Sequence, residues 1–200
     1  MSFRSGQSRV VVPFANRRPT AVTPVDQVSD QAALRPVLIV LHHTDQDSVQ
    51  ESLDTLRSAN SGGKVSSHYL VGRDGDLYQL VADGRRAWHA GPGSWGAITD
   101  LNSASIGIEI DNDGDSPFAP PQIDALVRLL DDLCTRLGIP RRQVIGHADL
   151  APTRKQDPSR FFPWQQLAEA GFGEIPHIGH QGGSALALSA YSQNPDAAWI

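Results

Sequence analysis

The chain has 200 residues, of which 40% are hydrophobic and 20% charged, and its formal net charge is -5. By the scaling of surface with size, folding would bury about 70% of the surface that the unfolded chain exposes, so one substantial core is feasible and wholesale disorder is excluded. No run approaches the ~18 apolar residues of a membrane span, and a nucleic-acid footprint is excluded because residues 37–200 hold twelve basic against twenty acidic side chains.

The first 36 residues predict an extended arm. They contain four prolines and several Ser, Thr and Gln residues, which disfavour a helix. The folded domain is expected to start at Val37, because residues 37–41 form a continuous, largely β-branched apolar run. Such a run is typical of a central strand that is buried on both faces. His42 and His43 would then lie at the end of this strand.

A helix and a β-hairpin are expected next. Ser48 followed by Glu51 is a capping-box pattern, apolar residues then recur at helical spacing, and residues 60–63 end the helix. Residues 66–71 and 77–81 have the composition of strands and flank a short, turn-rich connection. A β-hairpin is the simplest interpretation.

The middle of the chain predicts a loop, a strand and a long helix. Residues 84–102 hold four glycines and two tryptophans, which suits a long functional loop. Residues 105–110 alternate as a strand that carries Glu109. Residues 120–138 form the clearest helix, with prolines at its start, a glycine at its end and one apolar stripe. Cys134 lies on that stripe, so we interpret it as a small buried hydrophobe rather than a nucleophile.

Residues 143–147 predict a short strand that delivers His147, and Pro163 opens a last short helix. Strands and helices alternate along the chain. We therefore expect an α/β fold with a single three-layer domain at residues 37–173, in which helices flank a central mixed β-sheet. Residues 174–200 are rich in Gly, Ser, Ala and Gln and indicate a tail or the start of a truncated segment.

Three polar residues suggest a metal site. His42 and His147 each follow a buried strand, and Asp157 lies ten residues after His147. Two imidazoles and a carboxylate leave one position of a tetrahedral zinc ion open for water, as catalytic zinc sites do. Spacing alone is also compatible with structural histidines, which are the commoner case. Asp149, close to His147, is interpreted as a loop-capping carboxylate.

The sequence around these residues carries several motifs in a fixed order. They are VLHHT (40–44), SSHYLV (66–71), AWHAG (87–91), NSASIGIE (102–109), GHAD (146–149), KQDP (155–158) and FPW (162–164). With these motifs the chain resembles the zinc-dependent N-acetylmuramoyl-L-alanine amidases, an AmpD/AmiD-like group (amidase type 2) related in fold to peptidoglycan recognition proteins. The likeness covers residues 37–173 and implies that this region is the zinc amidase catalytic domain.

The resemblance implies one zinc ion (Zn2+) per chain, with His42, His147 and Asp157 as its ligands. It also implies that Glu109 and Lys155 are catalytic. Glu109 would accept the proton of a water molecule and return it to the leaving amine, and Lys155 would place a cation near the developing oxyanion. The neighbouring His43 has no counterpart in the family's motif, and adjacent strand residues point to opposite faces.

A substrate cleft is expected near the long loop. Aromatic faces pack on sugar rings and amides bind glycan or peptide groups, so Trp88, His89, Trp95 and Asn102 are assigned to substrate binding. Core tryptophans and polar groups that satisfy the loop backbone are an equal alternative. Ser159 departs from the family, since many members have glycine after the Asp-Pro pair, and this affects the expected turn but not the ligand set.

The implied activity is zinc-dependent hydrolysis of the amide bond between N-acetylmuramic acid and L-alanine, in bacterial cell-wall degradation, remodelling or recycling. Peptidoglycan or muropeptides would be the partner, and neither intact murein nor soluble muropeptides is favoured. A peptidoglycan-binding protein without hydrolysis is the main alternative, and the presence of all five polar residues argues against it. A zinc peptidase is disfavoured because the chain has no His-Glu-x-x-His helix.

The two ends of the chain bear on its location. The N-terminus is an Arg-rich arm without the apolar run of a secretory signal, and the C-terminus is the apolar sequence AAWI. Resemblance to envelope members that carry a further wall-binding segment suggests a chain trimmed at both ends. We therefore expect an enzyme of the periplasm or cell envelope, with a cytoplasmic recycling enzyme as the alternative.

Overall fold

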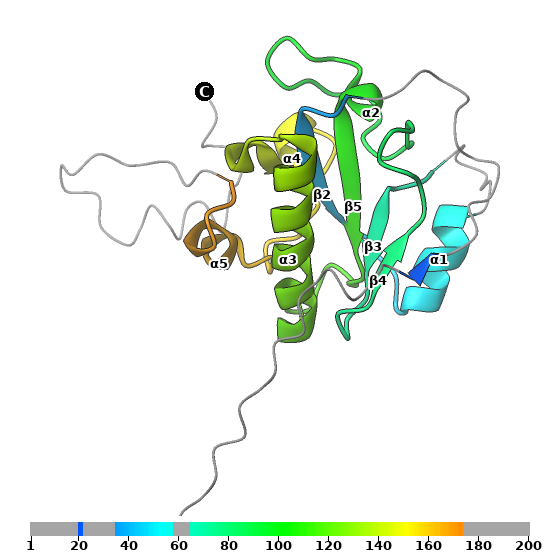
Figure 1. The fold of residues 1–200 in the computed structure, drawn as a ribbon. Helices are drawn as coiled ribbons and strands as arrows, with labels where there is room; N and C mark the ends of the chain where they lie inside the picture. The colour runs from blue at the N-terminus through cyan, green and yellow to red at the C-terminus, as the bar shows by residue number, and fades with distance from the viewer. Residues whose placement is uncertain (1–19, 22–34, 58–64, 174–200) are drawn as a thin grey trace, which may run out of the picture.

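The computed structural model describes residues 20–21, 35–57 and 65–173 of the chain (Figure 1). Its strands are β1 (Thr20–Ala21), β2 (Leu38–His43), β3 (Tyr69–Val71), β4 (Leu77–Gln79), β5 (Ser105–Ile110) and β6 (Val144–Gly146). Its α-helices are α1 (Val49–Arg57), α2 (Leu101–Ala104), α3 (Pro120–Leu137), α4 (His147–Leu150) and α5 (Trp164–Glu169), and one 3-10 turn spans Arg141–Gln143. Within the described residues, no helix is long and apolar enough to cross a bilayer.

The six strands form one mixed sheet in the order β1-β4-β3-β5-β2-β6. The hairpin strands β3 and β4 pair antiparallel, and the other neighbouring strands pair in parallel. β2 lies inside the sheet between β5 and β6, and its first five residues are buried. The expected central strand, β-hairpin and mixed sheet are therefore confirmed, except that the strand is shifted by one residue at its start. Val37 is 47% exposed and precedes β2, which extends through His43.

Side chains of β2 alternate between two apolar layers, as the period of a strand requires. Ile39 and Leu41 of β2 pack with α3 and α5 on one face of the sheet, whereas Leu38 and Val40 pack with α2 and α4 on the other. The short helix α1 also covers this second face, through contacts with Leu70 of β3. Figure 1 shows α3 in front of the sheet. The expected three-layer α/β domain is confirmed.

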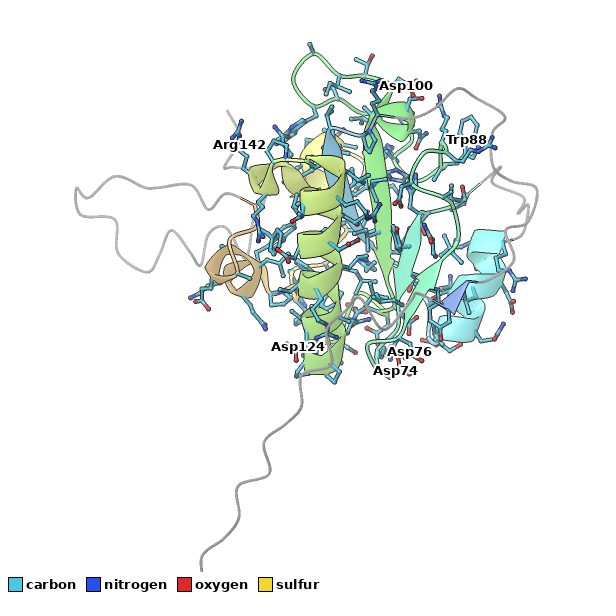
Figure 2. All side chains as sticks on the ribbon, viewed as in Figure 1. Asp74, Asp76, Trp88, Asp100, Asp124 and Arg142 are labelled. Atoms are coloured by element: carbon cyan, nitrogen blue, oxygen red, sulfur yellow. The ribbon has the colours of Figure 1, made fainter. Side chains whose placement is uncertain are left out.

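The long helix α3 presents its apolar stripe to the sheet. Pro120 begins the helix, and Gly138 ends it in the left-handed conformation with φ of 69°. Leu126 and Leu130 are fully buried, and Cys134 is only 5% exposed, as its place on the stripe predicts. Figure 2 shows the side chains between α3 and the sheet, with charged residues such as Asp124 at the surface.

Leu126→Ala is expected to lower the free energy of unfolding by roughly 2–5 kcal/mol, because it removes buried contacts and leaves a cavity. Arg128→Ala, on the exposed face of the same helix, is the matched control and should change stability by less than about 0.5 kcal/mol. Urea unfolding followed by circular dichroism measures both variants. Equal losses in the two would contradict the position of α3 in the core.

His147 differs from its expected place at the end of a strand. β6 ends at Gly146, and His147 is the first residue of the short helix α4. The Asp149 carboxylate accepts a hydrogen bond of 2.7 Å from the backbone N–H of Gly146, which caps this helical turn. The prediction that the strand includes His147 is therefore wrong, whereas the capping role of Asp149 is confirmed.

The ends of the chain were expected to be an arm at residues 1–36 and a tail at residues 174–200. Of the arm, Thr20–Ala21 pairs in parallel with β4 and forms one edge of the sheet. The tail, most of the arm and the glycines at 62–63 that were expected to end α1 lie outside the described residues. The domain boundaries at 36 and 174 stay predictions.

Candidate active site

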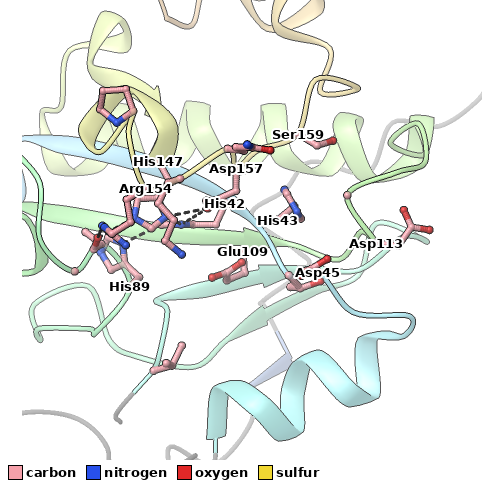
Figure 3. Close-up of a pocket in the computed structure, with 18 of the residues that line it drawn as sticks. His42, His43, Asp45, His89, Glu109, Asp113, His147, Arg154, Asp157 and Ser159 are labelled. Carbon is pink, nitrogen blue, oxygen red and sulfur yellow. Dashed lines mark hydrogen bonds and ion pairs between the residues drawn. The ribbon is translucent and has the colours of Figure 1, made fainter. Parts of the chain in front are cut away.

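His42, His147 and Asp157 come together on the face of the sheet opposite α3. Because Leu41 packs toward α3, the alternation of β2 points His42 to the other face. His147 enters from the start of α4, and Asp157 enters from the loop that follows α4. The Asp157 Oδ2 atom lies 2.9 Å from Nδ1 of each histidine, and the two Nδ1 atoms are 3.0 Å apart. Figure 3 shows the three side chains meeting.

These three atoms could hold a metal ion. A tetrahedral ion with bonds of about 2.0–2.1 Å holds its ligand atoms about 3.3 Å apart, only slightly farther than the atoms here. The Nε2 atom of His147 lies 2.8 Å from the carbonyl oxygen of Ala90, which can only accept a hydrogen bond. Nε2 therefore carries the proton of neutral His147, and the lone pair of Nδ1 faces the other two ligand atoms. The residues present fit a cation that prefers nitrogen and oxygen ligands.

The protonation states of this cluster also suit metal binding. Burial lowers the pKa of His42 to about 4, with repulsion from His147 acting in the same direction and Asp157 opposing it. Burial by itself would raise the pKa of Asp157, but the hydrogen bonds with His147 and His42 outweigh it and hold that pKa well below its ordinary value. His42 is thus neutral and Asp157 is charged at neutral pH, as metal ligands must be.

Glu109 lies beside the cluster on β5, in register with His42 on β2. Its side chain is buried, and Oε2 has no hydrogen-bond partner among the described residues. Burial raises the pKa of Glu109 well above its ordinary value, and repulsion from Asp157 adds to this, whereas Lys155 lowers it. A carboxyl group with a raised pKa in a cleft is suited to acid–base chemistry near neutral pH.

The cluster opens into a cleft of about 1620 Å³. Sites for small ligands are typically about 300–1,000 Å³, so this cleft has room for an extended molecule. Glu109 and the half-buried Lys155 line it beside the cluster. Figure 3 shows Asp45 and Asp113 toward one end of the cleft and Arg154 toward the other.

His43 lines the same cleft but lies apart from the three candidate ligand atoms (Figure 3). It points to the opposite face of β2 from His42, as strand alternation predicts. Its Nε2 atom approaches Gly114 so closely that an added Cβ there would lie only 2.8 Å away. His43 therefore packs against the loop that follows β5.

The four residues assigned to substrate binding have different surroundings. Trp88, His89 and Asn102 line the cleft, and Trp95 is not among the described residues that do so. The Trp95 indole N–H donates a 2.8 Å hydrogen bond to Gln143, and its ring packs against the core below α2. Asn102 Oδ1 accepts hydrogen bonds from the backbone N–H groups of His89 and Ala90. Asn102 thus shapes the loop, as the alternative interpretation held.

Two further residues help to form the site. Arg154 donates hydrogen bonds to the carbonyl oxygens of Ala90 and Pro92, which ties the long loop to the segment that carries Lys155. Sequence reasoning did not single out Arg154, and its place next to Lys155 was the only signal. Ser159 is buried and its hydroxyl accepts a 3.4 Å hydrogen bond from the backbone N–H of Phe161, so the turn forms without glycine.

Comparisons with known proteins identify relatives of the chain. The Amidase_2 family model, described as N-acetylmuramoyl-L-alanine amidase, matches residues 32–160. N-acetylmuramoyl-L-alanine amidase AmiD of Escherichia coli (strain K12) is 41% identical over 163 residues, which are 73% of this chain and 57% of that relative. 1,6-anhydro-N-acetylmuramyl-L-alanine amidase AmpD of Citrobacter freundii is 37% identical over 104 residues, 52% of this chain and 56% of that relative. The chain thus spans somewhat more than half the length of these curated relatives.

Solved structures agree with these matches. A complex of E. coli AmiD with the substrate anhydro-N-acetylmuramic acid-L-Ala-D-gamma-Glu-L-Lys has a TM-score of 0.65 and 41% identity, over 75% of this chain and 63% of that chain. A selenomethionine derivative of AmpD has a TM-score of 0.65 and 27% identity, over 76% of this chain and 93% of that chain. The expected AmpD-like amidase fold is confirmed.

Proposed function

Because the chain belongs to the N-acetylmuramoyl-L-alanine amidase family, we propose that it is a zinc-dependent amidase. It hydrolyses the amide bond between N-acetylmuramic acid and L-alanine in peptidoglycan or muropeptides. The observation that carries this proposal is the convergence of His42, His147 and Asp157 in a cleft that Glu109 and Lys155 also line. A protein that only bound peptidoglycan would have no need for this combination.

One zinc ion per chain would be held by Nδ1 of His42, Nδ1 of His147 and Oδ2 of Asp157. When bound, zinc lowers the pKa of its water ligand toward about 7 and polarises the carbonyl group of a substrate. The carboxylate of Asp157 remains charged beside both histidines and would compensate part of the positive charge of the zinc ion. The backbone carbonyl of Ala90 orients His147 through its Nε2–H.

The chemistry then depends on two side chains of the cleft. Glu109, in its ionised form, accepts a proton from the attacking water and returns it to the nitrogen of the departing L-alanine. Lys155 carries a positive charge beside the site and stabilises the oxyanion of the tetrahedral intermediate. Glu109 lies next to His42 in the sheet, and Lys155 lies two residues before Asp157, so both are held close to the reacting bond.

The size and lining of the cleft suit a substrate that combines a sugar and a peptide. Trp88 offers part of an aromatic ring to a sugar, and the Arg86 guanidinium lies 4.4 Å above that ring and steadies it. The mixed charge of Asp45, Asp113 and Arg154 suits a peptide that carries both amino and carboxylate groups. We include Trp88, His89 and Asn102 in the proposed substrate-binding wall, whereas Trp95 packs against the apolar cluster that contains Ala90 and Leu101.

Digestion of purified sacculi and of soluble muropeptides, with mass analysis of the products, tests this function. We expect free stem peptides that begin with L-alanine and glycan that has lost its peptides. A protein that binds sacculi but releases no peptide would instead support the rival function of a non-hydrolytic peptidoglycan-binding protein. Parallel digests show which of the two substrates is hydrolysed faster.

Lys155→Ala is expected to lower the hydrolysis rate by roughly 10²-fold, the effect of removing one group that stabilises an oxyanion. Bound zinc and thermal stability should not change, because Lys155 is half-buried and is not a candidate ligand. Lys155→Arg keeps the charge and should recover part of the rate. A near-normal rate for Lys155→Ala would remove this residue from the mechanism.

His42→Ala is expected to abolish activity together with zinc binding, whereas His43→Ala should have a much milder effect. The reason is that only His42 points toward the other two candidate ligand atoms. Metal analysis and initial rates of both variants provide the comparison. The reverse order would show that the neighbouring histidine is the ligand.

We further propose that residues 37–173 are the catalytic domain and that the enzyme acts in the periplasm or cell envelope, where murein lies. Fractionation of cells that express the complete natural gene tests the location. Activity confined to the cytosol would instead indicate a recycling enzyme that acts on soluble muropeptides. Either outcome leaves the catalytic residues as assigned.

A further inference from the structure

A row of hydrogen-bonded side chains extends from the candidate zinc site into the protein. The Nε2 atom of His42 lies 3.0 Å from Nδ1 of His89. The other ring nitrogen of His89, Nε2, lies 3.3 Å from the hydroxyl oxygen of Ser105. The Ser105 hydroxyl in turn donates a 2.6 Å hydrogen bond to the carbonyl oxygen of Leu101. All four residues are buried.

The last acceptor of this row determines the direction of every hydrogen bond in it. The carbonyl oxygen of Leu101 can only accept, so it takes the single proton of the Ser105 hydroxyl. Ser105 must then accept from Nε2–H of His89. A neutral His89 has one ring proton, so its Nδ1 carries a lone pair and accepts from Nε2–H of His42. The lone pair of His42 is therefore left on Nδ1, the atom that faces His147 and Asp157.

We propose that His89 is a positioning residue that holds His42 in the tautomer and ring orientation required for zinc binding. This inference rests on the proposed zinc site and gives His89 a function inside the protein, apart from any contact with substrate. Both ring nitrogens of His89 are already engaged, and its side chain is only 8% exposed. Groups that orient a metal-binding histidine typically change metal affinity by roughly 10–100-fold when they are removed.

The sheet provides a dedicated space for the His89 ring. Gly107 of β5 lies beneath it, and a Cβ atom at this position would come within 2.4 Å of the ring. The ring contacts His42 edge-on, with centroids 5.1 Å apart. A side chain at position 107 would therefore displace His89 from His42. The close approach of the His89 ring explains why the NSASIGIE motif has a glycine, Gly107, in the middle of a buried strand.

His68 offers a matched control. It is also fully buried, and its two ring nitrogens bond the carbonyl oxygen of Arg85 and the backbone N–H of Gly107. It touches the ring of His89 but has no contact with the candidate zinc ligands. Replacing His68 thus removes a comparable buried imidazole without changing the partner of His42.

Zinc affinity of the full chain, measured by competition with a chromophoric chelator, tests the proposal without an activity assay. His89→Leu should weaken zinc binding by roughly 10–100-fold, because His42 Nε2–H loses its acceptor. His89→Asn restores an acceptor oxygen near the place of Nδ1 and should recover most of the affinity. His68→Leu should lower thermal stability but leave zinc affinity unchanged.

The outcomes separate this proposal from the proposed function. A wild-type chain without zinc affinity would overturn the proposed zinc amidase and this inference with it. A wild-type chain that binds zinc, with equally tight binding by His89→Leu, would overturn the role of His89 alone. So would an equal loss of affinity in His68→Leu.

A measurement on the unmodified protein does not depend on how the variants fold. Nitrogen-15 NMR of the zinc-loaded wild-type chain reports which ring nitrogen of each histidine is protonated. We expect the proton on Nε2 of both His42 and His89. A proton on Nδ1 of His89 would contradict the proposal, because His89 would then donate to His42 rather than accept from it.

Discussion

Glu109→Gln is expected to lower the hydrolysis rate by roughly 10²–10⁴-fold while zinc and the fold are retained. Glutamine keeps the size of the side chain but cannot accept the proton of an attacking water molecule. The pKa of Glu109 is raised by burial and by the nearby Asp157 carboxylate, so this carboxyl group is tuned to exchange protons closer to neutral pH. Initial rates on a soluble muropeptide, with zinc content measured in parallel, provide the test.

Asp124→Asn is the matched control for this variant. It makes the same kind of change at an exposed carboxylate on α3, outside the cleft, and should leave the rate unchanged. The stability of Glu109→Gln should equal or exceed that of the wild-type chain, because a buried carboxyl oxygen without a hydrogen-bond partner is replaced by a neutral group. Normal turnover by Glu109→Gln would exclude Glu109 as the acid–base residue.

The parts of the fold with a clear periodicity were predictable from sequence. The continuous apolar run at residues 37–41 indicated a strand buried on both faces, and β2 lies between two parallel neighbours. The apolar stripe of residues 120–138 indicated α3 almost to the residue. These elements are predictable from local patterns, because the spacing of apolar residues indicates which side chains are buried.

The details set by contacts distant in sequence were not predictable in this way. Trp95 and Trp88 look alike in sequence, since each is a large ring in a glycine-rich loop. Only the fold shows that the Trp95 indole bonds Gln143, 48 residues away, whereas Trp88 lines the cleft. The helical turn that starts at His147 is likewise capped by a hydrogen bond from the Gly146 N–H to Asp149, which the period of the strand does not reveal.

The site shows the same division. Alternation within β2 correctly separated His42 from His43, because this is a local property of a strand. His89 was assigned to the substrate cleft from its loop and does line it, but its place in that loop did not indicate that its ring nitrogens bond His42 and Ser105. Gly107 was the only local sign of this packing, and a glycine in a strand has several explanations. The partner of a buried polar group is therefore the feature that sequence reasoning predicts least well.

The largest effect is expected from His147→Ala, which should lose most of its zinc and fall to background hydrolysis. Wild-type protein after dialysis should retain about one zinc ion per chain, bound by His42, His147 and Asp157. Without the His147 imidazole, two protein ligands remain, which is one fewer than catalytic zinc sites usually have. Metal analysis of both proteins, followed by rate measurements, gives the result directly.

Two controls make this result specific to the metal. His43→Ala removes an imidazole next to a candidate ligand and should keep its zinc, because His43 is in register with Ile110, which packs toward α3 on the opposite face of the sheet. Thermal unfolding of the wild-type chain should shift to higher temperature when zinc is added, since a ligand that binds only the folded state stabilises it, and His147→Ala should show little shift. Equal zinc content in His147→Ala and the wild-type protein would reject His147 as a ligand, even if the activity were lost.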